Sequence, residues 1–115
     1  ELYVTDNENH RVQVFSPSGA WGVQFRRHIG ERGGYPGQFE TPWGVAVARG
    51  VLIVSERDGR RVQALTLQGA PLQVLQLDAF ATPMGLCAGA DEDRVWVADA
   101  WSATNIHILR VLSYV

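Results

Sequence analysis

The sequence has no lysine, one cysteine, one methionine and no long hydrophobic run. All ten of its basic residues are arginine, and the formal net charge of the 115 residues is −2. The single Cys87 excludes an internal disulfide and a cysteine-based metal site. No apolar stretch approaches the ~18 residues of a membrane span, so we expect no membrane partner. The small net charge gives no electrostatic preference for nucleic acid.

The chain repeats itself at an offset of fifty residues. Residues 2–19 align without a gap with residues 52–69. The identical pairs are Leu2/Leu52, Val4/Val54, Arg11/Arg61, Val12/Val62, Gln13/Gln63 and Gly19/Gly69. A third copy begins at residues 95–99 and resumes at residues 106–109. A period of roughly 40–50 residues is the length of one supersecondary unit and indicates a repeat architecture.

The hydrophobic pattern within each copy has a period of two, which is typical of β-strands. Glycine and proline interrupt every stretch that could form a three-turn helix. One complete unit predicts four antiparallel strands at residues 43–48, 51–55, 61–66 and 72–77. Such a meander cannot bury both of its faces alone, and radial stacking of several units solves this problem. The predicted fold class is therefore all-β, with four-stranded antiparallel meanders stacked as β-propeller blades.

We interpret residues 1–115 as one partial propeller domain with blade remnants at 1–28, 42–77 and 83–115. The first residue lies inside a repeat, and two and a half blades do not close a ring of the usual 4–8. We therefore expect the chain to be a piece of a longer protein, with the remaining propeller blades of the parent chain as its partners. A small self-contained domain is the alternative.

Two segments resemble the NHL-repeat family. Residues 37–47, GQFETPWGVAV, resemble the signature that opens a blade, and residues 3–15 resemble its second half, with Asn9 and His10 supplying the letters of the name. The second copy has Arg57–Arg60 in place of this pair, and the third departs further. The resemblance implies an incomplete NHL-type propeller. Such domains are usually six-bladed and bind protein partners, in some cases as part of a ubiquitin ligase; others bind single-stranded RNA, and a minority are lyases.

The acid and arginine that bracket a turn recur in the repeat, as Asp6 with Arg11 and as Glu56 with Arg61. A structural clamp on the turn is favoured over a ligand site, because the pair follows the repeat. Asp99 keeps the acid without an arginine, so the clamp should be absent or rebuilt there.

Four apolar or small positions have structural interpretations. Trp43 begins an inner strand, where core filling is favoured over a stacking platform for a ring. Gly44 should let neighbouring inner strands approach closely. Trp96 aligns with core positions, and Cys87 is expected to be an inert, buried thiol.

Loops on one face form the binding surfaces of propellers, and the sequence places cations and aromatic residues there. A basic patch with aromatic side chains suits single-stranded RNA, whereas a mixed-charge, solvated face is the alternative. We place several of these cations in the long segment between the first two units, and Trp101 in an irregular loop. The candidate partner-binding residues are Arg26, Arg27, His28, Arg32, Tyr35, Arg57, Arg60 and Trp101.

Nothing in the sequence identifies a catalytic, cofactor-binding or metal-binding residue. Both visible inner strands begin with apolar residues, and no nucleophile and base have an interpretable spacing. We therefore predict a scaffold that binds protein partners through its loop face, with no cofactor. Single-stranded RNA binding is the first alternative, and a lyase-like or lactonase-like enzyme with its site in other blades is the second. The compartment is unknown, with a cytoplasmic location favoured.

Overall fold

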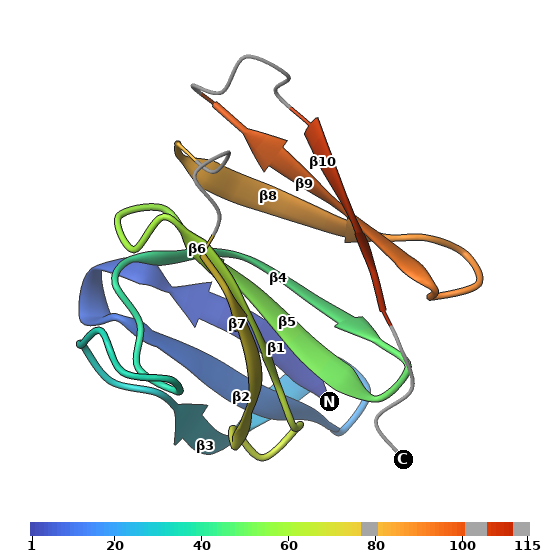
Figure 1. The fold of residues 1–115 in the computed structure, drawn as a ribbon. Helices are drawn as coiled ribbons and strands as arrows, with labels where there is room; N and C mark the ends of the chain where they lie inside the picture. The colour runs from blue at the N-terminus through green and yellow to red at the C-terminus, as the bar shows by residue number, and fades with distance from the viewer. Residues whose placement is uncertain (77–80, 101–105, 112–115) are drawn as a thin grey trace.

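The computed structural model describes residues 1–76, 81–100 and 106–111 (Figure 1). In this part of the chain almost every regular element is a strand, and a single 3-10 turn, η1, covers Asn7–Asn9. No helix among the described residues is long and apolar enough to cross a membrane. The strands are β1 (Leu2–Asp6), β2 (Arg11–Ser18), β3 (Gly22–Ile29), β4 (Pro42–Ala48), β5 (Val51–Glu56), β6 (Arg61–Leu65), β7 (Pro71–Leu75), β8 (Pro83–Ala88), β9 (Arg94–Asp99) and β10 (Ile106–Arg110).

The strands form three antiparallel sheets, which we call blades 1, 2 and 3. Blade 1 has the order β1-β2-β3, blade 2 has β4-β5-β6-β7, and blade 3 has β8-β9-β10. Blade 2 is a complete four-stranded meander, and its strands lie within two residues of the predicted ranges. This arrangement confirms the prediction of an all-β fold built from propeller blades.

The blades stack face to face, and two hydrophobic cores fill the spaces between them. One core joins blades 1 and 2, and the other joins blades 2 and 3. Alternation along β5 explains why this strand is buried along its whole length: Leu52 and Val54 face blade 1, whereas Val51 and Ile53 face blade 3. Burying each such side chain stabilises the stack by about 1.5–3 kcal/mol. In Figure 1 the blue, green and orange strands follow this order.

The strand register places the turns and the inter-blade segment at one end of the blades. Pro42 of β4 pairs with Glu56 at the end of β5, and Pro83 of β8 pairs with Asp99 at the end of β9. Each segment that enters a blade therefore arrives beside the turn that follows the blade's second strand. We call this the loop end; it includes residues 7–10, 30–41 and 57–60.

Hydroxyl groups link successive blades near their inner strands. The Thr5 Oγ1 in blade 1 donates to the Trp43 carbonyl of blade 2, at 2.9 Å. At the equivalent position in blade 2, the Ser55 Oγ donates to the Met84 carbonyl of blade 3 and accepts from the Gly44 N–H, at 2.9 Å. The repeat therefore carries a hydrogen bond from each of these two blades to the inner strand of the next.

The prediction that two side chains of blade 3 are buried in its core is wrong. Cys87 is exposed, and Trp96 is 37% exposed. Both side chains lie on the face of blade 3 that points away from blade 2, and no further blade among the described residues covers this face. The repeat correctly aligned Trp96 with the core position Ile53, but burial at that position depends on the next blade.

Candidate functional site

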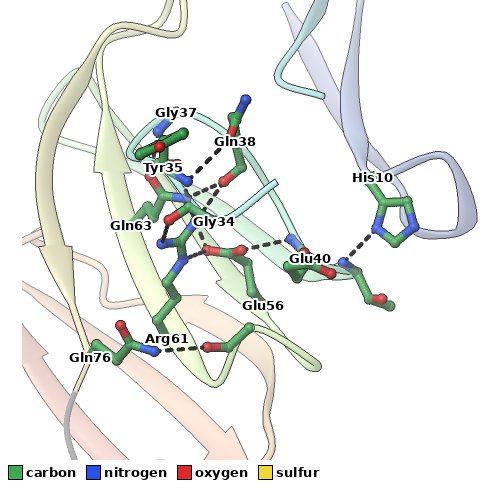
Figure 2. A network of polar contacts seen from close by, with 12 residues as sticks. His10, Gly34, Tyr35, Gly37, Gln38, Glu40, Glu56, Arg61, Gln63 and Gln76 are labelled. Carbon is green, nitrogen blue, oxygen red and sulfur yellow. Dashed lines mark hydrogen bonds and ion pairs between the residues drawn. The ribbon is translucent and has the colours of Figure 1, made fainter. Parts of the chain in front are cut away.

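The repeated acid and arginine of blade 2 form a buried ion pair. Glu56 and Arg61 are 0% and 5% exposed, and Arg61 Nε lies 2.6 Å from Glu56 Oε2 (Figure 2). The neighbouring Gln63, also buried, donates from Nε2 to the same carboxylate oxygen at 2.9 Å. Since a buried charge is costly unless it is paired and hydrogen-bonded, these three side chains form one interdependent unit.

This unit holds the segment that enters blade 2. The Arg61 guanidinium donates to the carbonyls of Gly34 and Gln38, at 2.7 and 2.8 Å. The Glu56 Oε1 accepts from the Glu40 N–H at 2.8 Å. Gln63 completes the set, because it donates to the Gln38 carbonyl at 2.7 Å and accepts from the Gly37 N–H at 2.9 Å. The predicted clamp is confirmed, and it extends beyond the turn to the inter-blade segment.

Blade 1 carries the same three residues in a more exposed setting. Arg11 Nε and Gln13 Nε2 donate to Asp6 Oδ2, at 2.9 and 2.8 Å. Hydrogen bonds from Gln13, Asn9 and Arg11 lower the pKa of Asp6 below its ordinary value of 3.8. The Asp6 and Arg11 side chains are 22% and 31% exposed, so water screens this pair more than its buried copy.

Blade 3 rebuilds the clamp without an arginine among its described residues. Asp99 accepts from the backbone N–H groups of Ala81 and Thr82, both at 2.9 Å, which are in the segment that enters blade 3. His107 stands at the position of Gln63, and its Nε2 lies 3.5 Å from Asp99 Oδ2. The acid thus holds the entering segment in blades 2 and 3, which makes it a part of blade construction.

Three of the predicted binding residues lie in a strand, contrary to the prediction. Arg26, Arg27 and His28 belong to β3, the outermost strand of blade 1. Arg27 is engaged there: it pairs with Glu1 at 2.9 Å and donates to the Leu67 carbonyl. An outer strand exposes much of its surface, so its sequence is polar and resembles a loop.

The other predicted residues that the structure describes lie at the loop end. Arg32 and Arg60 are exposed, and Tyr35 is 77% exposed. Arg57 lies beside the inner strand of blade 2. Trp101 lies outside the described residues.

A chain of contacts leads from the Trp43 ring through Arg57, Asp58 and Thr41 to His10. We call these five residues the Trp43 cluster. The Arg57 guanidinium lies 5.1 Å from the centroid of the Trp43 ring, and Trp43 is 37% exposed. Core filling by Trp43 is therefore wrong, because its ring carries a cation on an accessible surface. Sequence reasoning missed Asp58, although its place before Gly59 in a turn was visible.

Hydrogen bonds fix the rest of the Trp43 cluster. The Thr41 Oγ1 donates to Asp58 Oδ2 at 2.6 Å, and Arg57 pairs with Asp58 at 3.1 Å. The Thr41 N–H donates to His10 Nδ1 at 2.9 Å, which ties the turn of blade 1 to the start of blade 2. Thr41 first, and then Arg57, lowers the pKa of Asp58 below its ordinary value of 3.8.

We expect Asp58→Asn to change the response of the chain to acid. A carboxylate with a lowered pKa stabilises the fold above its ordinary pKa, and this contribution is lost as the pH falls through the folded value. The stability difference between wild type and variant should therefore shrink from neutral pH to below 3.8. Urea unfolding over this range measures it. A difference that stays constant with pH would contradict the role of the ionised Asp58.

The described residues contain no group of three or more histidine, cysteine, aspartate or glutamate side chains that could hold a metal ion. What the loop end offers is an aromatic ring, a stacked guanidinium and a fixed carboxylate. Such groups bind through stacking and hydrogen bonds.

Comparison with known proteins identifies the first blade. No curated protein matches the chain. The family model of the NHL repeat matches residues 1–15, which cover β1, η1 and most of β2. The chain therefore carries an NHL repeat in blade 1, as the resemblance in its sequence implied.

Proposed function

We propose that the chain is a binding scaffold that takes a segment of a partner protein at its loop end, on the Trp43 cluster. The accessible Trp43 ring beneath the Arg57 guanidinium is the observation that carries this proposal. Tryptophan and arginine are among the residues most enriched at the energetic centres of protein interfaces. An NHL repeat suggests a propeller scaffold for protein or RNA binding, and the first of these fits the cluster better.

The charges of the Trp43 cluster favour a peptide over a polyphosphate chain. Asp58 neutralises Arg57 there. A single-stranded nucleic acid needs unpaired cations along its backbone. The Arg57–Asp58 ion pair beside the Trp43 ring instead suits a peptide. Such a peptide would offer a carboxylate to Arg57 and a hydrogen-bond donor to Asp58.

A more specific hypothesis is that the scaffold is part of a ubiquitin ligase. In that setting the loop end would select substrates for a ligase. This part of the proposal rests on the family resemblance alone, and the binding test below does not depend on it.

A displayed peptide library, selected on the immobilised chain, tests the proposal. We expect selected peptides to lose about tenfold or more in affinity on Trp43→Ala and on Arg57→Gln, since losing a central interface residue costs about 2 kcal/mol or more and about 1.4 kcal/mol is tenfold. Trp21→Ala is the matched control: Trp21 is 99% exposed and lies between β2 and β3, away from the loop end. The control should bind as wild type does.

Single-stranded RNA oligomers provide the competing result. Suppose that RNA binds with an affinity that falls steeply with salt, and that the library yields no peptide whose affinity depends on Trp43. The scaffold then binds RNA, and the proposal of a protein partner is wrong. Selected peptides that are equally sensitive to Trp21→Ala would also contradict it.

A further inference from the structure

Thr41 is the residue at which blade 1, the inter-blade segment and the Trp43 cluster meet. Its N–H donates to His10 Nδ1 at 2.9 Å, and its Oγ1 donates to Asp58 Oδ2 at 2.6 Å. Its carbonyl accepts from the Arg57 N–H at 3.0 Å. Thr41 is 7% exposed and has a φ of 56°, a left-handed conformation that is unusual for a β-branched residue. These three hydrogen bonds therefore hold Thr41 in a conformation that its own chain does not favour.

The hydrogen bond between Thr41 and His10 requires a neutral histidine (Figure 2). A backbone N–H can only donate, so His10 Nδ1 carries no proton, and the proton of the neutral ring is on Nε2. A protonated ring has an N–H at both nitrogens, and two donors would then face each other. Histidine is the side chain that ordinarily changes its charge between pH 5 and 8. A modest fall in pH can therefore break this contact.

The contact between Thr41 and His10 departs from the repeat, unlike the clamp. Arg60 stands at the position of His10 in blade 2, with the same left-handed backbone, and its guanidinium has no acceptor. Thr82 stands at the position of Thr41 before blade 3, and its N–H donates to Asp99 at 2.9 Å. A carboxylate thus satisfies this N–H at the entrance to blade 3, whereas a histidine does so at the entrance to blade 2. The histidine is therefore not required to build a blade.

Electrostatics also couple His10 to Asp58. Thr41 and then Arg57 are the main causes of the lowered pKa of Asp58, and the charge of His10 adds to them. A protonated His10 is therefore attracted to the carboxylate that Thr41 and Arg57 share, while it repels the Thr41 N–H. The other charged residues of the elements that meet here are Asp6, Glu8 and Arg11 around the turn of blade 1, Glu40 before Thr41, and Arg60 in the turn of blade 2.

We propose that His10 is a pH sensor that controls the Trp43 cluster. While His10 is neutral, it holds Thr41, and Thr41 in turn fixes Asp58, the partner of Arg57. When His10 is protonated, the buried Thr41 N–H loses its acceptor, the left-handed backbone of Thr41 relaxes, and Asp58 is released. The scaffold then binds its partner at neutral pH and releases it in mild acid. The effect on binding rests on the function proposed above, whereas the opening of the Thr41 contact does not.

Amide hydrogen exchange of the 115-residue chain tests the opening of this contact without any partner. The wild type is compared with His10→Asn, because asparagine offers an oxygen acceptor close to the position of Nδ1, tolerates the left-handed backbone and does not titrate. At pH 5.5 we expect the Thr41 amide to exchange at least about tenfold faster in the wild type than in the variant, since a broken contact lets the amide exchange from the open form. The difference should disappear at pH 7.5.

His107→Gln is the matched control for this comparison. The chain contains three histidines, and glutamine is the residue that blades 1 and 2 have at the position of His107. This variant should keep the acid response of the wild type at Thr41. A Thr41 amide that is protected equally at pH 5.5 in the wild type and in His10→Asn would overturn the proposal, and so would an acid response that His107→Gln abolishes.

The affinity of a library peptide that depends on Trp43 tests the regulation of binding. We expect the wild type to bind it about tenfold more weakly at pH 5.5 than at pH 7.5, since the apparent affinity falls with the fraction of chains in the binding-competent state. His10→Asn should bind it with the same affinity at both pH values. Equal losses in acid for the two proteins would overturn regulation by His10. A library that yields no such peptide contradicts the proposed function, and the sensor then stands or falls with the exchange of the Thr41 amide.

Discussion

Replacing Glu56 with glutamine is expected to lower the free energy of unfolding by about 3–5 kcal/mol, because it leaves Arg61 as a buried charge without a counter-ion. Glu56 is fully buried, and its carboxylate also accepts from Gln63 and from the Glu40 N–H. Glutamine has nearly the same volume, so the loss reports charge and hydrogen bonding and not a cavity. Urea denaturation followed by circular dichroism measures it.

The repeat supplies a matched control for this substitution. Asp6→Asn makes the same change in blade 1, where the pair with Arg11 is partly exposed. Exposed ion pairs contribute about 0–1 kcal/mol. If the two variants lost equal amounts of unfolding free energy, the buried pair in blade 2 would not stabilise the fold more than the exposed pair in blade 1, and our account of the clamp would be wrong.

Replacing Gly44 with alanine is expected to cost about 1–3 kcal/mol, the usual cost of overpacking. A Cβ at this position would collide with the Met84 carbonyl and crowd the Leu86 N–H and the Ser55 hydroxyl. The substitution would push β8 away from β4 and weaken the hydrogen bond from Ser55 to Met84. The free energy of unfolding measures the effect.

Gly85→Ala is the control, since Gly85 stands at the same repeat position in blade 3. A Cβ there meets nothing within 4 Å. We expect a change close to zero, or a slight gain, because alanine restricts the unfolded chain. If Gly85→Ala destabilised the chain as much as Gly44→Ala does, close packing of inner strands would not explain the glycine.

Much of the fold was predictable because the sequence contains repeated units that can be aligned with one another. A feature that recurs at Arg11 and Arg61 with unchanged spacing identifies a structural position, and period-two alternation locates the strands between the turns. The close approach at Gly44 followed from the same logic. Repetition thus distinguishes the residues that build every blade from those that belong to one blade alone.

Burial on the outer blades was not predictable in this way. Trp96 and Cys87 occupy positions that are core in a complete stack, yet their environment is set by the next blade and not by their own sequence. Arg57 was among the predicted binding residues, but its neighbours were not. Thr41 reaches Asp58 through the pairing of β4 with β5, and His10 reaches Thr41 only when blades 1 and 2 stack.

The central claim is that the repeated acid, arginine and glutamine hold the inter-blade segment in place. Amide hydrogen exchange of the wild-type chain tests it most directly, because the Gly37 and Glu40 N–H groups donate to the Gln63 and Glu56 side chains and not to a strand backbone. We predict that these two amides exchange as slowly as those of the neighbouring strands β5 and β6. Exchange as fast as that of an open loop would contradict the account.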